Sequence, residues 1–279
     1  MLRRPRMRVR VRVRPLHFSL NRLIPNILTV LALCAGMTAI RFAIAEKFET
    51  AVAAVIVAAI LDGLDGRIAR LLKGTSSFGA QLDSLSDFVS FGVAPAVVLY
   101  LWTASQLHGL GWAVVLIFAV CCALRLARFN TQIGAELPPY AYNFFTGVPA
   151  PAGAGLVLLP MIANFEFGAD VVFRSPSLNA ATMLAVAALM VSRVPTFAMK
   201  RFRVPHEWVL PTLLVVGALA AFLTTEPWAT MLVVGAVYAG SIPFSIRSYR
   251  RLRRATEEMR MATLRVASEA GVAAERSFK

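Results

Sequence analysis

The chain has 279 residues, of which 58% are hydrophobic, and its mean hydropathy is +0.66. This composition is too apolar for an ordinary soluble domain and indicates a protein embedded in a membrane. In a soluble protein the formal net charge of +14 would suggest nucleic-acid binding, but in a membrane protein the loop topology and anionic lipid headgroups account for it.

Eight apolar stretches approach the length of about 20 residues that a helix needs to span a bilayer. They lie at residues 26–45, 50–71, 83–103, 109–129, 146–164, 178–194, 209–224 and 228–246. The connections between them are too short to hold a soluble domain. We therefore predict an all-α integral membrane protein, a polytopic bundle of about eight transmembrane helices at 26–246, with a basic arm at 1–25 and a basic tail at 247–279.

The distribution of basic residues supports this number of spans. With both termini in the cytoplasm, 26 of the 29 Lys and Arg residues fall in cytoplasmic segments, and only Arg41, Lys47 and Arg174 lie outside. An odd number of spans would destroy this partition, so the positive-inside rule favours both termini in the cytoplasm. We interpret the Arg-rich N-terminal arm as binding an anionic lipid surface and not nucleic acid. A cleaved secretory signal is the alternative for this end, but the first apolar run is long and contains Arg41.

The aspartates are the most informative residues of the chain. Of five in all, four fall within 26 residues: Asp62, Asp65, Asp83 and Asp87. An ionised group costs about 2.5–3.5 kcal/mol at the centre of a membrane helix, so such residues are rarely accidental. Spacings of three and four residues put each pair on one face of its helix. The loop at 73–79 is short, so the two helices are antiparallel neighbours whose carboxylates can face one another at the cytoplasmic end.

A cluster of carboxylates offers only hard oxygen ligands, which suit Mg²⁺ or Mn²⁺ and not zinc or copper. Two ions about 3.5–4 Å apart could clamp a pyrophosphate. Gly66, Ala69 and Gly79 are small enough to let a ligand approach the backbone closely, although helix packing alone also explains Gly66 and Ala69. Arg70, one turn beyond Gly66, is placed to meet a phosphate or nucleotide.

The pattern Asp62-x2-Asp65-Gly66-x2-Ala69-Arg70-x8-Gly79-x3-Asp83-x3-Asp87 resembles the signature of the CDP-alcohol phosphotransferases. These integral membrane enzymes transfer a phosphatidyl or related group from a CDP-linked donor to an alcohol and release CMP. The resemblance implies that the four aspartates bind two divalent ions and that Asp87 also accepts a proton. It further implies that the donor is contacted by Gly66, Arg70, Ser76 and Gly79.

Four further segments, within roughly residues 22–205, resemble the membrane-embedded bacterial and archaeal phosphatidylserine synthases. They are Pro25–Thr29, Ser90–Ala96, Ala123–Asn130 and Phe145–Ala152. This resemblance implies CDP-diacylglycerol as donor, L-serine as acceptor and a homodimer. Arg125 and Arg128 end the fourth span and are candidates for holding the serine carboxylate or the donor phosphates, because arginine matches such oxyanions bidentately. The alternative is that both merely follow the positive-inside rule.

Two other functions remain open at this point. The same metal site could serve a different alcohol, such as glycerol 3-phosphate or inositol phosphate. A protein of another class, a divalent-cation transporter, could use the aspartates to line an ion path. Such a path needs polar groups at several depths of the membrane, whereas these carboxylates gather at one end of the spans.

Overall fold

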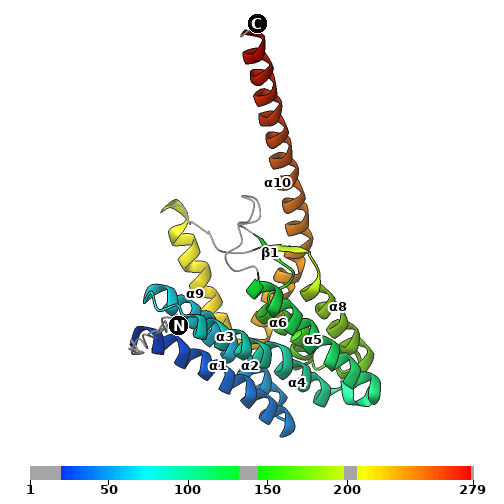
Figure 1. The fold of residues 1–279 in the computed structure, drawn as a ribbon. Coiled ribbons are helices and arrows are strands. Elements are labelled where there is room, and N and C mark those ends of the chain that lie inside the picture. The colour runs from blue at the N-terminus through cyan, green and yellow to red at the C-terminus, as the bar shows by residue number, and fades with distance from the viewer. Residues whose placement is uncertain (1–19, 132–143, 198–205, 278–279) are drawn as a thin grey trace, which may run out of the picture.

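The computed structural model describes residues 20–131, 144–197 and 206–277, and its fold is shown in Figure 1. The described residues are overwhelmingly helical. Their only strands are β1 (Phe144–Thr146) and β2 (Pro195–Phe197), which pair antiparallel with Phe145 opposite Thr196. The prediction of an all-α polytopic membrane protein is thereby confirmed. Most of the predicted basic arm, residues 1–19, lies outside the described residues.

The helices follow the apolar runs of the sequence. They are α1 (Leu20–Ile44), α2 (Phe48–Leu71), α3 (Ser77–Asp87), the π-helix η1 (Phe88–Val93), α4 (Ala94–Trp102), α5 (Gly109–Thr131), α6 (Ala150–Phe167), α8 (Pro176–Val191), α9 (Val209–Thr225) and α10 (Pro227–Ser277). Short helical segments occupy three connections: η2 (Ala104–Leu107), α7 (Asp170–Phe173) and η5 (His206–Trp208). Each predicted span corresponds to one long helix, except that residues 83–103 fall within the run α3–η1–α4.

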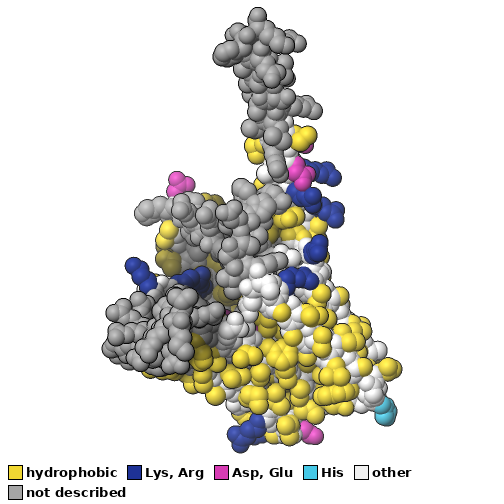
Figure 2. All heavy atoms as spheres, viewed as in Figure 1, with side chains coloured by type: hydrophobic (Ala, Val, Ile, Leu, Met, Phe, Trp, Pro, Cys, Tyr) yellow, Lys and Arg dark blue, Asp and Glu magenta, His cyan; other side chains and the backbone are white. Residues whose placement is uncertain are grey.

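Within the described residues, five helical stretches are long and apolar enough to cross a membrane: Leu23–Ile44, Ser77–Trp102, Gly109–Thr131, Ala150–Phe167 and Pro227–Met259. The apolar helices α8 and α9 are shorter, with 16 and 17 residues. Helix α2 has 24 residues, but its last part carries Asp62, Asp65, Arg67 and Arg70. Hydrophobic side chains cover the visible surface of the bundle (Figure 2), as expected of a surface that faces lipid.

Helix α1 packs along α2 on one side and against α3 and η1 on the other. A methyl group on Gly36 would lie only 2.8 Å from the Cα atom of Ser90, so the backbones of α1 and η1 approach closely. The hydroxyls of Ser86 and Ser90 donate to the backbone carbonyls of Thr29 and Ala32, at 3.1 and 3.2 Å. These contacts fix the position of α3, and hence of its aspartates, relative to α1.

The other half of the bundle consists of α5, α6, α8 and α10. Its core includes the fully buried side chains of Phe118, Val157, Met161, Met183 and Met190. The β1–β2 pair rests on α10, where the ring of Phe144 contacts those of Phe197 and Tyr249. Helix α9 lies at the edge of the bundle, where it contacts α10, and it has no buried residue. Its first part leans away from the other helices (Figure 1).

Hydrogen bonds define one end of the bundle, which we call the site end. There Thr29 at the start of α1 bonds to Asp65 near the end of α2, and Asn130 at the end of α5 bonds to Ser84 of α3. Arg128 joins the end of α5 to that of α8. At the opposite end, Arg174 lies over the ring of Trp102. Helix α10 continues without a break far beyond the bundle, so the predicted basic tail prolongs the last span (Figure 1).

Candidate active site

Three of the four predicted aspartates meet at the site end. Oxygen atoms of Asp62 on α2 and of Asp83 and Asp87 on α3 lie within 4.8 Å of one another, and all three side chains are partly exposed. Three carboxylates this close repel one another strongly unless positive charge is added. Their oxygens are the ligands that Mg²⁺ and Mn²⁺ prefer. The residues therefore fit a divalent metal ion, as the sequence predicts.

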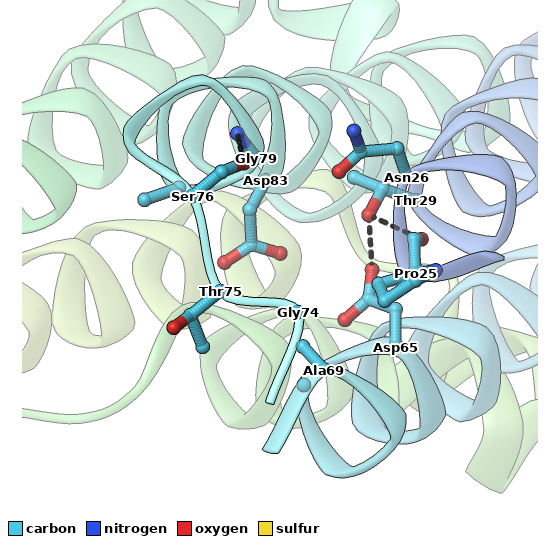
Figure 3. Close-up of a pocket in the computed structure, with 12 residues that line it drawn as sticks. Pro25, Asn26, Thr29, Asp65, Ala69, Gly74, Thr75, Ser76, Gly79 and Asp83 are labelled. Atoms are coloured by element: carbon cyan, nitrogen blue, oxygen red, sulfur yellow. Dashed lines mark hydrogen bonds between the residues drawn. The ribbon is translucent and has the colours of Figure 1, made fainter. Parts of the chain in front are cut away.

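Asp65 occupies a different position from the other three. Its side chain is 4% exposed, and its Oδ2 accepts a hydrogen bond of 2.5 Å from Thr29 Oγ1 (Figure 3). The same hydroxyl lies 3.1 Å from the carbonyl of Pro25, so two acceptors share its single proton. Asp65 interacts electrostatically with Asp62 and Asp83, which places it beside the cluster. Its role as a metal ligand stays a prediction.

A cavity of about 190 Å³ lies between the start of α1, the end of α2 and the loop that leads into α3 (Figure 3). It is lined by Pro25, Asn26, Thr29, Asp65, Gly66, Ala69, Gly74, Thr75, Ser76, Gly79, Ala80 and Asp83. The lining thus includes two of the aspartates and three of the four residues predicted to contact a CDP-linked donor. The cavity adjoins the carboxylate cluster through Asp83.

The residues predicted to contact the donor differ in what surrounds them. Ser76 caps the N-terminus of α3, where its hydroxyl accepts from the backbone N–H of Gly79 at 3.0 Å. A methyl group at Gly79 would lie 2.8 Å from Asn26 Oδ1, so packing within the protein already requires glycine there. At Gly66 a methyl group would meet no atom of the other described residues within 4 Å, its own helix backbone aside. Gly66 therefore faces open space in the cavity, whereas Gly79 serves helix packing as well.

The three candidate arginines are placed differently. Arg70 is exposed and donates from Nε to the carbonyl of Gly66 at 2.9 Å. Arg125 is buried, with 9% of its surface exposed, and interacts electrostatically with Asp62 and Asp87. Arg128 instead donates from Nη1 to the carbonyl of Val191 at 2.7 Å, at the end of α8. The structure thus brings Arg125 to the carboxylate cluster, and a substrate contact of Arg128 stays a prediction.

Sequence reasoning attached no individual role to Thr29 or Asn26. Both are polar residues at the start of an apolar span, and this is the signal that could have singled them out. The π-helix η1 was not predicted either. It begins directly after Asp87, and π-helical turns occur frequently at functional sites.

The family described as CDP-alcohol phosphatidyltransferase matches residues 22–194, which include all four aspartates. The chain belongs to this family. A second family description, CDP-alcohol phosphatidyltransferase 2, matches residues 207–243, in the region of α9 and the start of α10.

The chain is similar to several family members named CDP-diacylglycerol–serine O-phosphatidyltransferase. It is 41% identical over 236 residues to the one from Mycobacterium tuberculosis, which covers 84% of this chain and 82% of the relative. It is 34% identical over 179 residues to the one from Methanocaldococcus jannaschii, covering 63% of this chain and 76% of the relative. The one from Bacillus subtilis is 33% identical over 172 residues, covering 61% and 88%.

Proposed function

We propose that this protein transfers the phosphatidyl group of CDP-diacylglycerol to the hydroxyl of L-serine, giving phosphatidylserine and CMP. The observation that carries the proposal is the carboxylate cluster of Asp62, Asp83 and Asp87 beside the cavity lined by the family's signature residues. The relatives named for this reaction, at up to 41% identity over most of the chain, support serine as the acceptor.

The donor is proposed to bind with its pyrophosphate at the cluster and its nucleotide part toward the cavity beside Gly66. One divalent ion held by Asp62, Asp83 and Asp87, and a second that also uses Asp65, would neutralise the pyrophosphate and the charge that develops on the departing CMP. Gly66 leaves room for the donor, and the hydroxyls of Thr75 and Ser76 lie in the cavity wall.

A second cavity, of about 490 Å³, supports a lipid as substrate. It is almost entirely apolar and lies between α2, α6, α9 and α10, with Val55, Ile56, Leu159 and Leu223 among its lining residues. An apolar cavity of this kind suits hydrocarbon, because apolar surface gains free energy when it leaves water. We place acyl chains of CDP-diacylglycerol here.

In the transfer step, Asp87 is proposed to accept the proton of the serine hydroxyl. The serine oxygen then forms a bond to the phosphorus that bears diacylglycerol, and the bond from this phosphorus to the CMP oxygen breaks. General-base help of this kind typically contributes about 10²- to 10⁴-fold to the rate. Arg125, the buried cation beside Asp62 and Asp87, is proposed to bind the carboxylate of serine.

The site end is proposed to face the cytoplasm of a prokaryotic cell. Among the described residues, Arg41, Lys47 and Arg174 are the basic residues on the opposite side of the bundle, whereas the site end carries many. Figure 2 shows several of them where α10 leaves the bundle. The positive-inside rule favours this orientation, and anionic lipids would attract the same residues. The homodimer stays a prediction.

Acceptor-dependent release of CMP tests the proposed function. Detergent-purified protein receives CDP-diacylglycerol and Mg²⁺ or Mn²⁺, with serine, glycerol 3-phosphate, inositol phosphate or no acceptor. We expect release with serine, and a rate at least about 100-fold lower for Asp87→Asn, because the general base is lost. Release with another alcohol alone would contradict serine as the acceptor. Divalent-ion binding without release for any alcohol would instead favour the transporter.

A further inference from the structure

Helix α10 carries a buried tyrosine hydroxyl that makes no hydrogen bond with the described residues. The Oη atom of Tyr238 is buried, and no hydrogen-bond partner for it occurs among the described residues. Buried tyrosine hydroxyls usually find a partner, because leaving one unpaired in the protein interior is costly. Tyr238, Ile242 and Ser245 lie one turn apart along the face of α10 that packs on the bundle, where Ile242 and Ser245 are buried.

The unpaired hydroxyl lies beside the buried arginine of the site. Tyr238 and Arg125 interact electrostatically, and Arg125 also interacts with Asp62 and Asp87. Thr196 of β2 lies close to Tyr238 as well. Its hydroxyl donates to the carbonyl of Gly147 at 2.9 Å and keeps its acceptor lone pairs, but no hydrogen bond of good geometry joins it to Tyr238. Tyr238 on α10 and Arg125 on α5 therefore lie near one another, and Arg125 lies near the carboxylate cluster.

The guanidinium of Arg125 also lacks hydrogen-bond and ion-pair partners among the described residues. Its guanidinium lies 5.7 Å from the ring centre of Phe129, and within the described part of the chain it makes no hydrogen bond or ion pair. A guanidinium carries five N–H donors in a planar fork that matches a carboxylate. Among the described residues, neither the buried guanidinium nor the buried hydroxyl makes a hydrogen bond of good geometry to an acceptor, so the two form a pair of donors suited to one anionic group.

We propose that Tyr238 and Arg125 together bind the carboxylate of the acceptor amino acid, with Tyr238 as a specificity-determining residue. The inference rests on the proposed function, since it names the group of serine that this part of the site recognises. An alcohol without a carboxylate would leave both donors unpaired, and sites built to hydrogen-bond a substrate group reject analogues that lack it. The ring of Tyr238 also borders the apolar cavity, so this residue separates the acceptor from the lipid.

Steady-state kinetics of Tyr238→Phe test the inference. The variant keeps the ring and removes one hydroxyl that donates to a charged group, so we expect the KM for serine to rise about 10- to 100-fold. The KM for CDP-diacylglycerol and the melting temperature should stay as in the wild type. Ser241→Ala is the matched control, since it removes a hydroxyl one turn away that already donates to the carbonyl of Tyr238 at 2.7 Å. An unchanged KM for serine, or an equal rise for both substrates, would overturn the inference.

Wild-type protein alone supplies a second test. L-Serinamide keeps the hydroxyl and the amine of serine but lacks the carboxylate, so its kcat/KM should be at least about 100-fold lower than that of serine. Equal use of the two would overturn carboxylate recognition even if Tyr238→Phe does not fold. If the wild type releases CMP with serine and Tyr238→Phe has an unchanged KM for serine, the inference is refuted but the proposed function is not. Absence of serine-dependent release in the wild type would refute the proposed function and this inference with it.

Discussion

At the scale of single residues, the site contains two kinds of glycine. Gly79 has protein atoms pressed against it, since a methyl group there would lie 2.8 Å from Asn26 Oδ1 and 3.1 Å from Ser76 Oγ. Gly66 lines the same cavity, and a methyl group there would meet no atom of the other described residues within 4 Å, its own helix backbone aside. A substitution at Gly79 therefore disturbs the fold, whereas one at Gly66 tests whether a ligand uses the space.

Gly66→Ala should weaken donor binding without weakening the fold. We expect kcat/KM for CDP-diacylglycerol to fall at least about tenfold, equivalent to about 1.4 kcal/mol, because the methyl group occupies space that the donor needs. The melting temperature should not fall, since alanine favours a helix over glycine. Gly63→Ala is the control, because Gly63 lies on the same helix with open space around it and does not line the cavity. Equal kinetics for both variants would show that the donor does not approach Gly66.

Thr29 is the residue that holds Asp65 beside the cluster. Thr29→Val removes the 2.5 Å hydrogen bond with little change in shape. A hydrogen bond to a charged group contributes about 1.5–3 kcal/mol, so the concentration of Mg²⁺ or Mn²⁺ needed for half-maximal activity should rise about 10- to 100-fold. Thr38→Val, on the same helix but with an exposed hydroxyl that donates to the carbonyl of Cys34, should change nothing. The same metal requirement in both variants would argue against a role for Asp65 in metal binding.

At the scale of elements, the site depends on how α1 packs against η1. Gly36 lets the two backbones approach, and Ser86 and Ser90 bond to the carbonyls of Thr29 and Ala32, which lie about two turns and one turn before Gly36 on α1. Thr29 lies on α1, and Asp87 is the last residue of α3, directly before η1. A displacement of α1 should therefore alter the site although Gly36 does not touch it.

Gly36→Ala should destabilise the protein by about 1–3 kcal/mol, because the added methyl group would lie 2.8 Å from a backbone atom of Ser90 and force the helices apart. A lower melting temperature in detergent, together with reduced activity, is the expected result. Gly217→Ala on α9 is the control, since a methyl group there meets no protein atom within 4 Å. If both variants melt alike, the α1–η1 contact is not a constraint on the fold.

The elements also show what sequence could and could not predict. The helices were predictable because each needs a long apolar run, and the aspartate cluster was predictable because spacings of three and four residues select one helix face. The π-helical turn at η1 and the β1–β2 pair depend on contacts between distant residues, such as Ser90 with the carbonyl of Ala32 and Phe144 with Phe197. A local sequence pattern cannot predict contacts between residues that are far apart in the chain.

The same reasoning explains the differences at the site. The carboxylate of Asp65 accepts a hydrogen bond from Thr29, which is 36 positions away in sequence, so the spacing of the aspartates could not predict this contact. Arg125 and Arg128 have equivalent positions in the sequence pattern, and only the packing of α5 against α8 separates their surroundings. The sequence could not predict that the buried hydroxyl of Tyr238 makes no hydrogen bond with the described residues, because this depends on how α10 packs on the bundle.

At the scale of the whole molecule, charge divides the bundle between its two ends. The loop at Lys73 lies at the site end, and the turn at Lys47 lies at the other. Because the positive-inside rule puts the more basic end in the cytoplasm, a membrane-impermeant maleimide added to intact cells should label Lys47→Cys and not Lys73→Cys. Lys73→Cys should react only after permeabilisation. The reverse pattern would place the carboxylate cluster outside the cell.

The central claim is that the carboxylate cluster catalyses transfer of a phosphatidyl group to serine. The most direct test is to measure conversion of labelled serine into labelled phosphatidylserine by purified protein after chelation and after return of Mg²⁺ or Mn²⁺. We predict no product with chelator, full recovery of the wild type on return of the ion, and no recovery of Asp87→Asn. Product formation in the presence of chelator, or by Asp87→Asn at the wild-type rate, would contradict the claim.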